Sequence, residues 1–462
     1  MNRFVLMAIL AGVGQCAVSG ADFKSGNLCY DLLADGSVEV AAPDEGMVYG
    51  GVLTVPAIVR HGSVQRQVSG IGSHAFSGCR DLTGITLSEG ISYIGAYAFY
   101  KCNNLESVKL PSSLSVIEGR AFAMCGRLAD IQLPLQLSEI GENAFSYCSS
   151  LGSIGRLATY ANLGYGCFSY CTSLQSVDLA DHYGNIGSGV FMGCSSLWQV
   201  KLREDMPEIA AYTFADCVSL TDVTLPEGLS EIGNWAFSGC TALKKLYIPP
   251  TISGIGERAF AGCSSIVRLD FSDKGGAAIG EGAFENLSNL PWVFLQGVES
   301  IGDSVFAGCT SLEWIEIERS VEEIGSRAFA NCINLKRVYS HSDWPARITV
   351  NTFDTSTERD GELLVFPDSR DRYSLAAYWN RFVKISATER FPLSANAIAD
   401  DEISVSACEG VITIGGTSVE TTIYDISGHL LYQGSSEYLV DYVWPGGIYL
   451  VTVPGRMVKI RL

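Results

Sequence analysis

The chain has 462 residues, 47% of them hydrophobic, and a formal net charge of -19. An acidic surface of this kind lacks the basic patch that nucleic acid requires and is repelled by anionic lipid, so we expect neither as a partner. The hydrophobic share indicates a packed chain and not a disordered one.

The chain begins MNRFVLMAILAGVGQCAVSGADF. Arg3 supplies a short positive start, the apolar run at 4–14 is too short to span a bilayer, and small residues precede Asp22. We therefore predict a signal peptide at 1–21, with a lipoprotein cut at Cys16 as the alternative. No later segment has 18 continuous apolar residues, so we predict no transmembrane segment in the mature chain.

Residues 22–70 alternate between apolar and polar side chains, as in GNLCYDLLADGSVEVAAP and YGGVLTVPAIVRHGSVQRQVSGIG. Such alternation is typical of short strands with one buried face. We expect these residues to form β-hairpins that cover the first turn of the domain that follows, because an uncovered end would expose its core and its sheet edge.

A repeat of about 23 residues follows. Each copy reads Ile-Gly, two variable residues, a small residue, Phe, two residues, Cys and then Leu-x-x-Val-x-Leu. The segment IGENAFSYCSSL at 140–151 is the first part of one such copy. The phenylalanines of the thirteen copies are Phe76, Phe99, Phe122, Phe145, Phe168, Phe191, Phe214, Phe237, Phe260, Phe284, Phe306, Phe329 and Phe353. A fixed period of this length is the signature of a repeat architecture.

The Leu-x-x-Val-x-Leu segment predicts a short strand, often ended by a proline or a charged residue. Burial of the large apolar side chains of one coil contributes about 10 kcal/mol of stabilising free energy, at roughly 2 kcal/mol for each side chain. Ordering the backbone of 23 residues costs on the order of 1–2 kcal/mol per residue in conformational entropy, which is more. A coil therefore needs neighbours above and below it. We predict a solenoid of 23-residue coils, mostly β with short helical or 3-10 turns, with a parallel sheet along one side.

A cysteine recurs three residues after the phenylalanine in eleven copies, and Leu287 takes its place in the tenth. A position that accepts leucine is apolar, so we interpret the cysteine column as packing. Disulfides between stacked cysteines are the alternative, but parallel Cβ vectors suit bridging poorly. Ligands along one line cannot surround zinc, so we predict no metal site and no cofactor. Cys29 and Cys408 lie outside the column and are not assigned.

The glycine after isoleucine is present in ten of the thirteen copies, and Glu118, Ala210 and Thr349 replace it in the others. Because residues with side chains are accepted, a positive φ is not the expected reason for glycine here. We predict instead that neighbouring coils approach closely at this position.

The last copy departs from the pattern, since Ser356 stands where the cysteine is expected. The segment YSLAAYWNRFVKI at 373–385 then predicts a short helix that caps the stack. We place the solenoid with its C-terminal cap at 71–388 and a polar linker at 389–402.

The phrase IG..AF..C..L..V.L over residues 71–356 resembles the BspA-like leucine-rich repeats of bacterial and protozoan surface proteins. The resemblance implies a non-enzymatic surface or secreted protein, often one that acts in adhesion or host-protein binding. Because ligands differ between members of the family, the resemblance identifies no partner.

Residues 403–462 contain several short strand patterns separated by turn signals, which predict a small all-β sandwich. The phrases YDISG, GGIYLVTV and the terminal KIRL resemble the C-terminal sorting domain of the type IX secretion system. This resemblance implies contact with the export machinery and a location outside the cell or on the outer membrane. An ordinary accessory sandwich is the alternative.

We find no catalytic signature of a metalloprotease, serine hydrolase, P-loop or dinucleotide-binding enzyme, so we predict no enzyme. The outward positions of the strands are more informative, because the last five coils place large aromatic and basic residues there. These candidate ligand-binding residues are Lys245, Tyr247, Arg268, Trp292, Phe294, Trp314, Arg337 and Tyr339. Aromatic and arginine side chains together are typical of binding hot spots.

The predicted function is adhesion or binding of a protein or glycan by an exported surface protein. The alternative for the aromatic residues is that they cover a sheet edge or pack under the C-terminal region. A structural spacer or an undetected glycan or peptide hydrolase are the alternatives for the chain as a whole.

Overall fold

The structure, a computed structural model, describes residues 20–45, 47–272 and 275–388, together with six strands between residues 404 and 461. The chain divides into two compact units, residues 1–387 and 388–462. The predicted signal peptide, except its last two residues, and the predicted linker lie outside the described residues.

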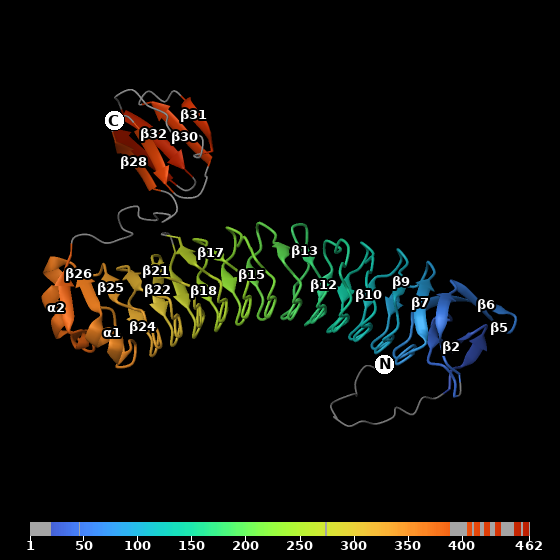
Figure 1. Ribbon diagram of the computed structural model, residues 1–462. Helices are drawn as coiled ribbons and strands as arrows, with labels where there is room; N and C mark the ends of the chain where they lie inside the picture. Colours follow the sequence, from blue (N-terminus) through green and yellow to red (C-terminus); the bar gives the residue numbers. More distant parts are fainter. Residues whose placement is uncertain are drawn as a thin grey trace. The chain divides into compact units, whose positions relative to one another are not determined.

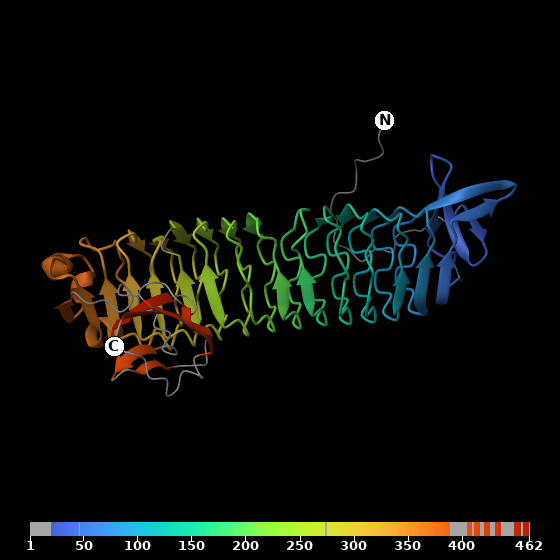
Figure 2. The ribbon, with the colours of Figure 1, turned by 90° about the horizontal axis from the view of Figure 1, so that it is seen from above.

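The first unit is a solenoid whose coils stack in one row, as predicted (Figures 1 and 2). The Leu-x-x-Val-x-Leu segments form a row of parallel strands that we call the strand face. Its members are β4 (Gly51–Val55), β7 (Leu82–Leu87), β9 (Ser107–Lys109), β13 (Ser176–Asp178), β14 (Gln199–Lys201), β17 (Lys245–Ile248), β19 (Arg268–Phe271), β21 (Trp292–Leu295), β23 (Trp314–Ile317), β25 (Arg337–Ser340), β26 (Glu362–Val365) and β27 (Lys384–Ala387). The strand face is not one continuous sheet, because its strands fall into four separate groups.

A second row of parallel strands runs along another side of the coils (Figure 2) and was not predicted. The residues around each Ile-Gly step form it. Its members are β6 (Val64–Ile71), β8 (Tyr93–Ile94), β10 (Val116–Ile117), β11 (Glu139–Ile140), β12 (Asn162–Leu163), β15 (Glu208–Ile209), β16 (Glu231–Ile232), β18 (Gly254–Ile255), β20 (Ala277–Ile279), β22 (Val298–Ile301) and β24 (Glu323–Ile324). Where both rows have paired strands, a coil is thus hydrogen-bonded to its neighbour on two sides.

The core holds a continuous stack of the thirteen phenylalanine rings. Neighbouring rings lie nearly parallel with centroids 4.8 to 5.9 Å apart. Tyr49 closes the stack at one end, and Trp379 and Phe382 close it at the other. Every ring is therefore packed against the coils on both sides, which is why one coil cannot be stable alone.

The glycine after isoleucine lies where two coils approach each other, as predicted. A Cβ atom built on Gly95 would lie 2.7 Å from the backbone nitrogen of Ser73, and one on Gly141 would lie 2.6 Å from that of Gly119. Neither glycine has a positive φ. The backbone of the preceding coil thus leaves little room for a side chain here.

Positive φ angles occur instead two residues before and two residues after the phenylalanine. Tyr97 and Lys101 flank Phe99 with φ of 58° and 60°, and Gly78 follows Phe76 with φ of 72°. The left-handed backbone turns the chain twice in each of the first twelve coils, and glycine is frequent in the second of these positions.

The N-terminal end is covered by short strands. An antiparallel sheet of β1 (Phe23–Ser25), β2 (Leu28–Leu32) and β3 (Val38–Ala41) joins β6 through a parallel pairing, and β5 (Ile58–His61) forms a hairpin with β6. Cys29 is fully buried there, with its Sγ 3.9 Å from Met47 Sδ.

The C-terminal end differs from the expected single helix at 373–385. Helix α1 (Thr355–Asp360), the 3-10 turn η1 (Pro367–Ser369), helix α2 (Arg370–Leu375) and the turn η2 (Trp379–Arg381) alternate with β26 and β27. The helix ends early because Ala376 returns to an extended backbone. The two added strands continue the strand face beyond the last phenylalanine.

In the second unit the described residues form two antiparallel sheets. One contains β28 (Ser404–Cys408) and β29 (Val411–Gly415), and the other has the order β31-β30-β32-β33. The strands of the second sheet are β30 (Glu420–Asp425), β31 (Leu430–Ser435), β32 (Ile448–Val453) and β33 (Arg456–Arg461). This unit is all-β in its described part, and Cys408 is the last residue of β28.

Candidate ligand-binding face

The eight candidate residues lie on five strands of the strand face. Two of these strands, β17 and β19, form one small sheet, and β21, β23 and β25 belong to the next. The parallel register places Lys245 beside Arg268, and Trp314 between Trp292 and Arg337. The structure therefore gathers the candidates into two in-register groups.

Trp292 and Trp314 form the centre of the second group. Their rings stack with centroids 5.5 Å apart and an angle of 10° between planes. Both side chains are partly exposed, and Arg337 on the next strand is exposed. A pair of flat rings that keeps contact with solvent is a platform on which another ring can stack.

The first group is more polar. Lys245 is exposed, and the ring of Tyr247 is 47% exposed. Arg268 is tied to its own strand, because its Nε donates to Asp270 Oδ2 at 2.6 Å. This pairing holds the guanidinium over the strand face and reduces its net charge there.

Tyr339 is not exposed, contrary to the expectation for an outward strand position. It is 8% exposed, and its ring meets Trp314 edge to face with centroids 6.0 Å apart. Glu316, on the neighbouring strand, is also buried, and His341 Nε2 lies 2.5 Å from its Oε1. Tyr339 therefore supports Trp314 from the side. Phe294 is partly exposed, with its ring centroid 6.0 Å from that of His341.

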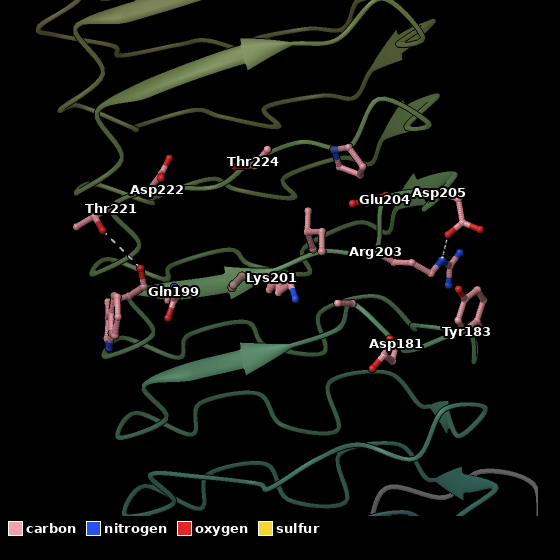
Figure 3. A pocket seen from close by; sticks show the side chains of 15 residues that line it. Asp181, Tyr183, Gln199, Lys201, Arg203, Glu204, Asp205, Thr221, Asp222 and Thr224 are labelled. Carbon is pink, nitrogen blue, oxygen red and sulfur yellow. Dashed lines mark hydrogen bonds and ion pairs between the residues drawn. The ribbon is translucent and has the colours of Figure 1, made fainter. Parts of the chain in front are cut away.

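A groove on the strand face of the middle coils was missed at the sequence level (Figure 3). It has a volume of about 790 Å³ and lies over β14 and the coils on either side. Trp198, immediately before β14, is 49% exposed, and Tyr183 is 52% exposed. The position of Trp198 in the repeat holds no other aromatic residue in any copy, and that isolated change was the signal that could have revealed it.

The family of the chain follows from its repeat. A family model described as BspA type leucine-rich repeat region matches residues 60–174, 161–291 and 277–360, which together span more than half of the chain. The chain belongs to the BspA-type leucine-rich repeat family. The resemblance seen in the repeat sequence is thereby confirmed.

Solved structures of other leucine-rich repeat proteins share the solenoid. A leucine-rich repeat protein from Bacteroides ovatus is 27% identical, with a TM-score of 0.52, and the match covers 80% of this chain and all of that one. The pneumococcal vaccine antigen PcpA is 20% identical with a TM-score of 0.54, and the match covers 80% of this chain and 98% of that one. At 20% identity the second likeness shows the fold alone. No curated protein sequence matches this chain.

The thiols of this leucine-rich repeat protein lie in the core, and they do more than fill space. From Cys102 onward, each column thiol donates to the carbonyl oxygen of the phenylalanine in the preceding coil, as Cys102 Sγ does to Phe76 at 3.0 Å and Cys148 Sγ to Phe122 at 3.2 Å. Burial raises the pKa of Cys148 to about 12. A thiol that stays protonated is a poor nucleophile and a poor metal ligand.

The thirteen cysteines from Cys29 to Cys332 of this leucine-rich repeat protein are free thiols, and within the described residues no group of three or more His, Cys, Asp or Glu side chains could hold a metal ion. None of the helices in that part of the chain has the length and apolar character of a membrane span. The features on the strand face that suit a ligand are its exposed aromatic and polar side chains.

Proposed function

We propose that the chain is an exported bacterial surface protein that binds a protein or glycan through the strand face of its solenoid, and that it acts in adhesion. The observation that carries this proposal is the stacked, partly exposed pair Trp292 and Trp314 beside exposed Arg337. Tryptophan and arginine contribute a large share of binding energy where they are accessible to a partner. Lys245, Tyr247, Arg268 and Phe294 would extend the contact along the face.

The binding proposal is tested with the double variant Trp292→Ala, Trp314→Ala. We expect the unchanged protein to bind one or more members of a glycan array or of a panel of extracellular-matrix proteins, and the double variant to lose at least about tenfold in affinity. Because the two rings are partly exposed, the midpoint of thermal unfolding should move by only a few degrees.

Trp344→Ala is the matched control, since Trp344 is 70% exposed and lies outside both groups. It should bind as the unchanged protein does. If the unchanged protein binds nothing, it is a spacer, and if it releases cleaved product it is a hydrolase. Unaltered binding by the double variant would place the contact elsewhere.

We further propose that residues 403–462 form a type IX sorting domain and that residues 1–21 are a signal peptide. The all-β character of the second unit supports the first part of this proposal. Fractionation of cells with mass spectrometry of the mature termini tests both. We expect a mature N-terminus near Asp22 and a protein that stays inside the outer membrane when residues 403–462 are deleted. Secretion of the truncated protein would contradict the sorting role.

A further inference from the structure

The groove over β14 is built from three consecutive coils. Gln199 and Lys201 point outward from β14, Asp222 lies beside Gln199 on the next coil, and Thr224 follows two residues later (Figure 3). All four side chains are exposed. The floor of the groove is thus a mixed set of amide, ammonium, carboxylate and hydroxyl groups.

These floor side chains differ from the equivalent ones in two other coils, where the outward side chains bond to one another. Gln132 Nε2 donates to Asp130 at 3.1 Å, and Arg268 pairs with Asp270 at 2.6 Å. For Gln199 and Asp222, by contrast, no side-chain hydrogen bond is found in the part of the chain that the structure describes. Their hydrogen-bonding capacity is available to a ligand.

The end of the groove beyond β14 is held rigid. Arg203 lies over the ring of Tyr183, with its guanidinium carbon 4.6 Å from the ring centroid, and donates from Nε to Asp205 at 2.5 Å. Its Nη1 donates to the backbone oxygen of His182 at 2.6 Å. Arg203 is only 14% exposed in its side chain, so its charge is already satisfied by the protein.

The other end carries Trp198. Its ring is 49% exposed and has no ring or cation partner among the described residues. Arg203 is five positions after Trp198, so the floor between the two ends is about 16 Å long at the rise of an extended strand. That length exceeds a single small molecule and suits a short chain of linked units.

The charges of the groove nearly cancel. Asp205 is paired with Arg203, and Asp181 is paired with Arg156 at 3.1 Å. The remaining charged side chains of the groove are Lys201, Glu204 and Asp222, which leave one net negative charge. With a chain charge of -19 in addition, an anionic ligand is disfavoured.

A peptide bound as an added strand does not fit this surface. Strand addition requires unpaired backbone groups at a sheet edge, whereas Gln199 on β14 pairs with Ser176 on one side and bridges to Asp222 on the other. A ligand here meets side chains only. Sugar hydroxyls both donate and accept hydrogen bonds, so they match the mixed floor, and the C–H face of a sugar ring stacks on an open indole.

We propose that the groove formed by Trp198, Gln199, Lys201, Asp222, Thr224 and Tyr183 binds an uncharged oligosaccharide, with Trp198 as the stacking platform. This site is separate from the Trp292–Trp314 pair and does not depend on it. The polar side chains of the floor determine which arrangement of sugar hydroxyl groups is bound. Tyr183 and Arg203 close the end of the groove opposite Trp198.

The test is binding of the full-length chain to an array of neutral glycans, followed by calorimetric titration with the strongest binder. Trp198→Ala should weaken binding at least about tenfold, since it removes the platform, and Gln199→Ala should weaken it less. Trp344→Ala is the control, since it removes a more exposed tryptophan that lies outside the groove, and it should bind normally. Because the ligand is uncharged, the affinity should stay within about twofold between roughly 0.05 and 0.5 M salt.

Three results would overturn the proposal: no neutral glycan on the array binds, binding persists in Trp198→Ala, or the ligand lost in that variant is a peptide or a charged glycan whose affinity falls with salt. Since Trp198 is exposed, its variant should keep the circular dichroism and thermal midpoint of the unchanged protein. The variant Trp292→Ala, Trp314→Ala should retain glycan binding at this groove, which separates the outcome from that of the first binding proposal.

Discussion

At the scale of single residues, each coil depends on two backbone turns through the left-handed region. Gly78 occupies one of them, with φ of 72°, and a Cβ atom built on it would meet nothing within 4 Å. The cost of a side chain there is therefore conformational and not steric.

Gly78→Ala tests this cost. We expect it to lower the free energy of unfolding by about 1–2 kcal/mol, because alanine is strained at positive φ. Gly126→Ala is the matched control: its nearest contact would be Ser149 Oγ at an ordinary 3.5 Å, and its φ is not positive. That variant should change stability by no more than about 0.5 kcal/mol, or stabilise slightly. Urea unfolding measures both, and equal midpoints would show that the turn is not strained.

The residue scale also shows what the repeat pattern could and could not predict. The phenylalanine stack and the close approach at Gly95 could be predicted from the pattern, because a fixed period places equivalent side chains directly above one another in successive coils. The thiol bonds to the preceding coil did not follow, since they depend on where a carbonyl oxygen points. The burial of Glu316 did not follow either, since Glu316 contacts His341, which lies outside the Leu-x-x-Val-x-Leu segment.

At the scale of elements, the main surprise is the second row of parallel strands. These strands are mostly two residues long, as in Glu139–Ile140, and too short to show any alternation in the sequence. They form because the coils are already held at strand spacing by the stacked core. The groove at Trp198 was missed for a related reason: its aromatic residue lies one position before the alternating part of the strand.

The C-terminal cap is the element whose energetic role is easiest to isolate. Trp379 is 1% exposed, its ring lies 5.7 Å from that of Phe353, and its Nε1 donates to the oxygen of Ala346 at 2.8 Å. It covers the last ring of the core stack. Without it, the final coil would expose the apolar floor that every other coil hides.

Trp379→Ala should cost about 3–5 kcal/mol of local stability. Since each coil contacts only its neighbours, we expect loss of amide hydrogen-exchange protection in the coils around Phe329 and Phe353 and none in those around Phe99. Trp344→Ala, which removes a 70% exposed tryptophan near the same end, should cost less than about 1 kcal/mol. Uniform loss of protection along the whole solenoid would show that the coils unfold as one unit.

At the scale of the whole molecule, the buried cysteine column makes the free energy of unfolding depend on pH. Burial raises the pKa of Cys148 and of Cys194 to about 12, and it raises the pKa of Cys171 and of Cys217 well above the ordinary value. In the unfolded chain the same thiols ionise near pH 8.5. Above that pH the folded chain holds more protons than the unfolded one, so stability falls as pH rises.

Each thiol whose pKa is raised contributes a loss of about 1.4 kcal/mol per pH unit above pH 8.5, and ten thiols of the column are of this kind. The total, on the order of 10 kcal/mol per unit, is comparable to the whole stability of an ordinary domain. We therefore expect the urea midpoint, measured with reductant, to fall steeply between about pH 8.5 and 9.5.

A variant with alanine at Cys148, Cys171, Cys194 and Cys217 separates the thiols from other groups that titrate in this range. It should be less stable at neutral pH, because it loses buried volume and four hydrogen bonds to phenylalanine carbonyls. Its midpoint should nevertheless depend on pH about two fifths less steeply, since four of the ten column thiols with a raised pKa are gone while every tyrosine and lysine remains. An unchanged dependence of the midpoint on pH would mean that the thiols ionise as readily in the folded chain as in the unfolded one. That result would contradict the burial of the cysteine column in the core.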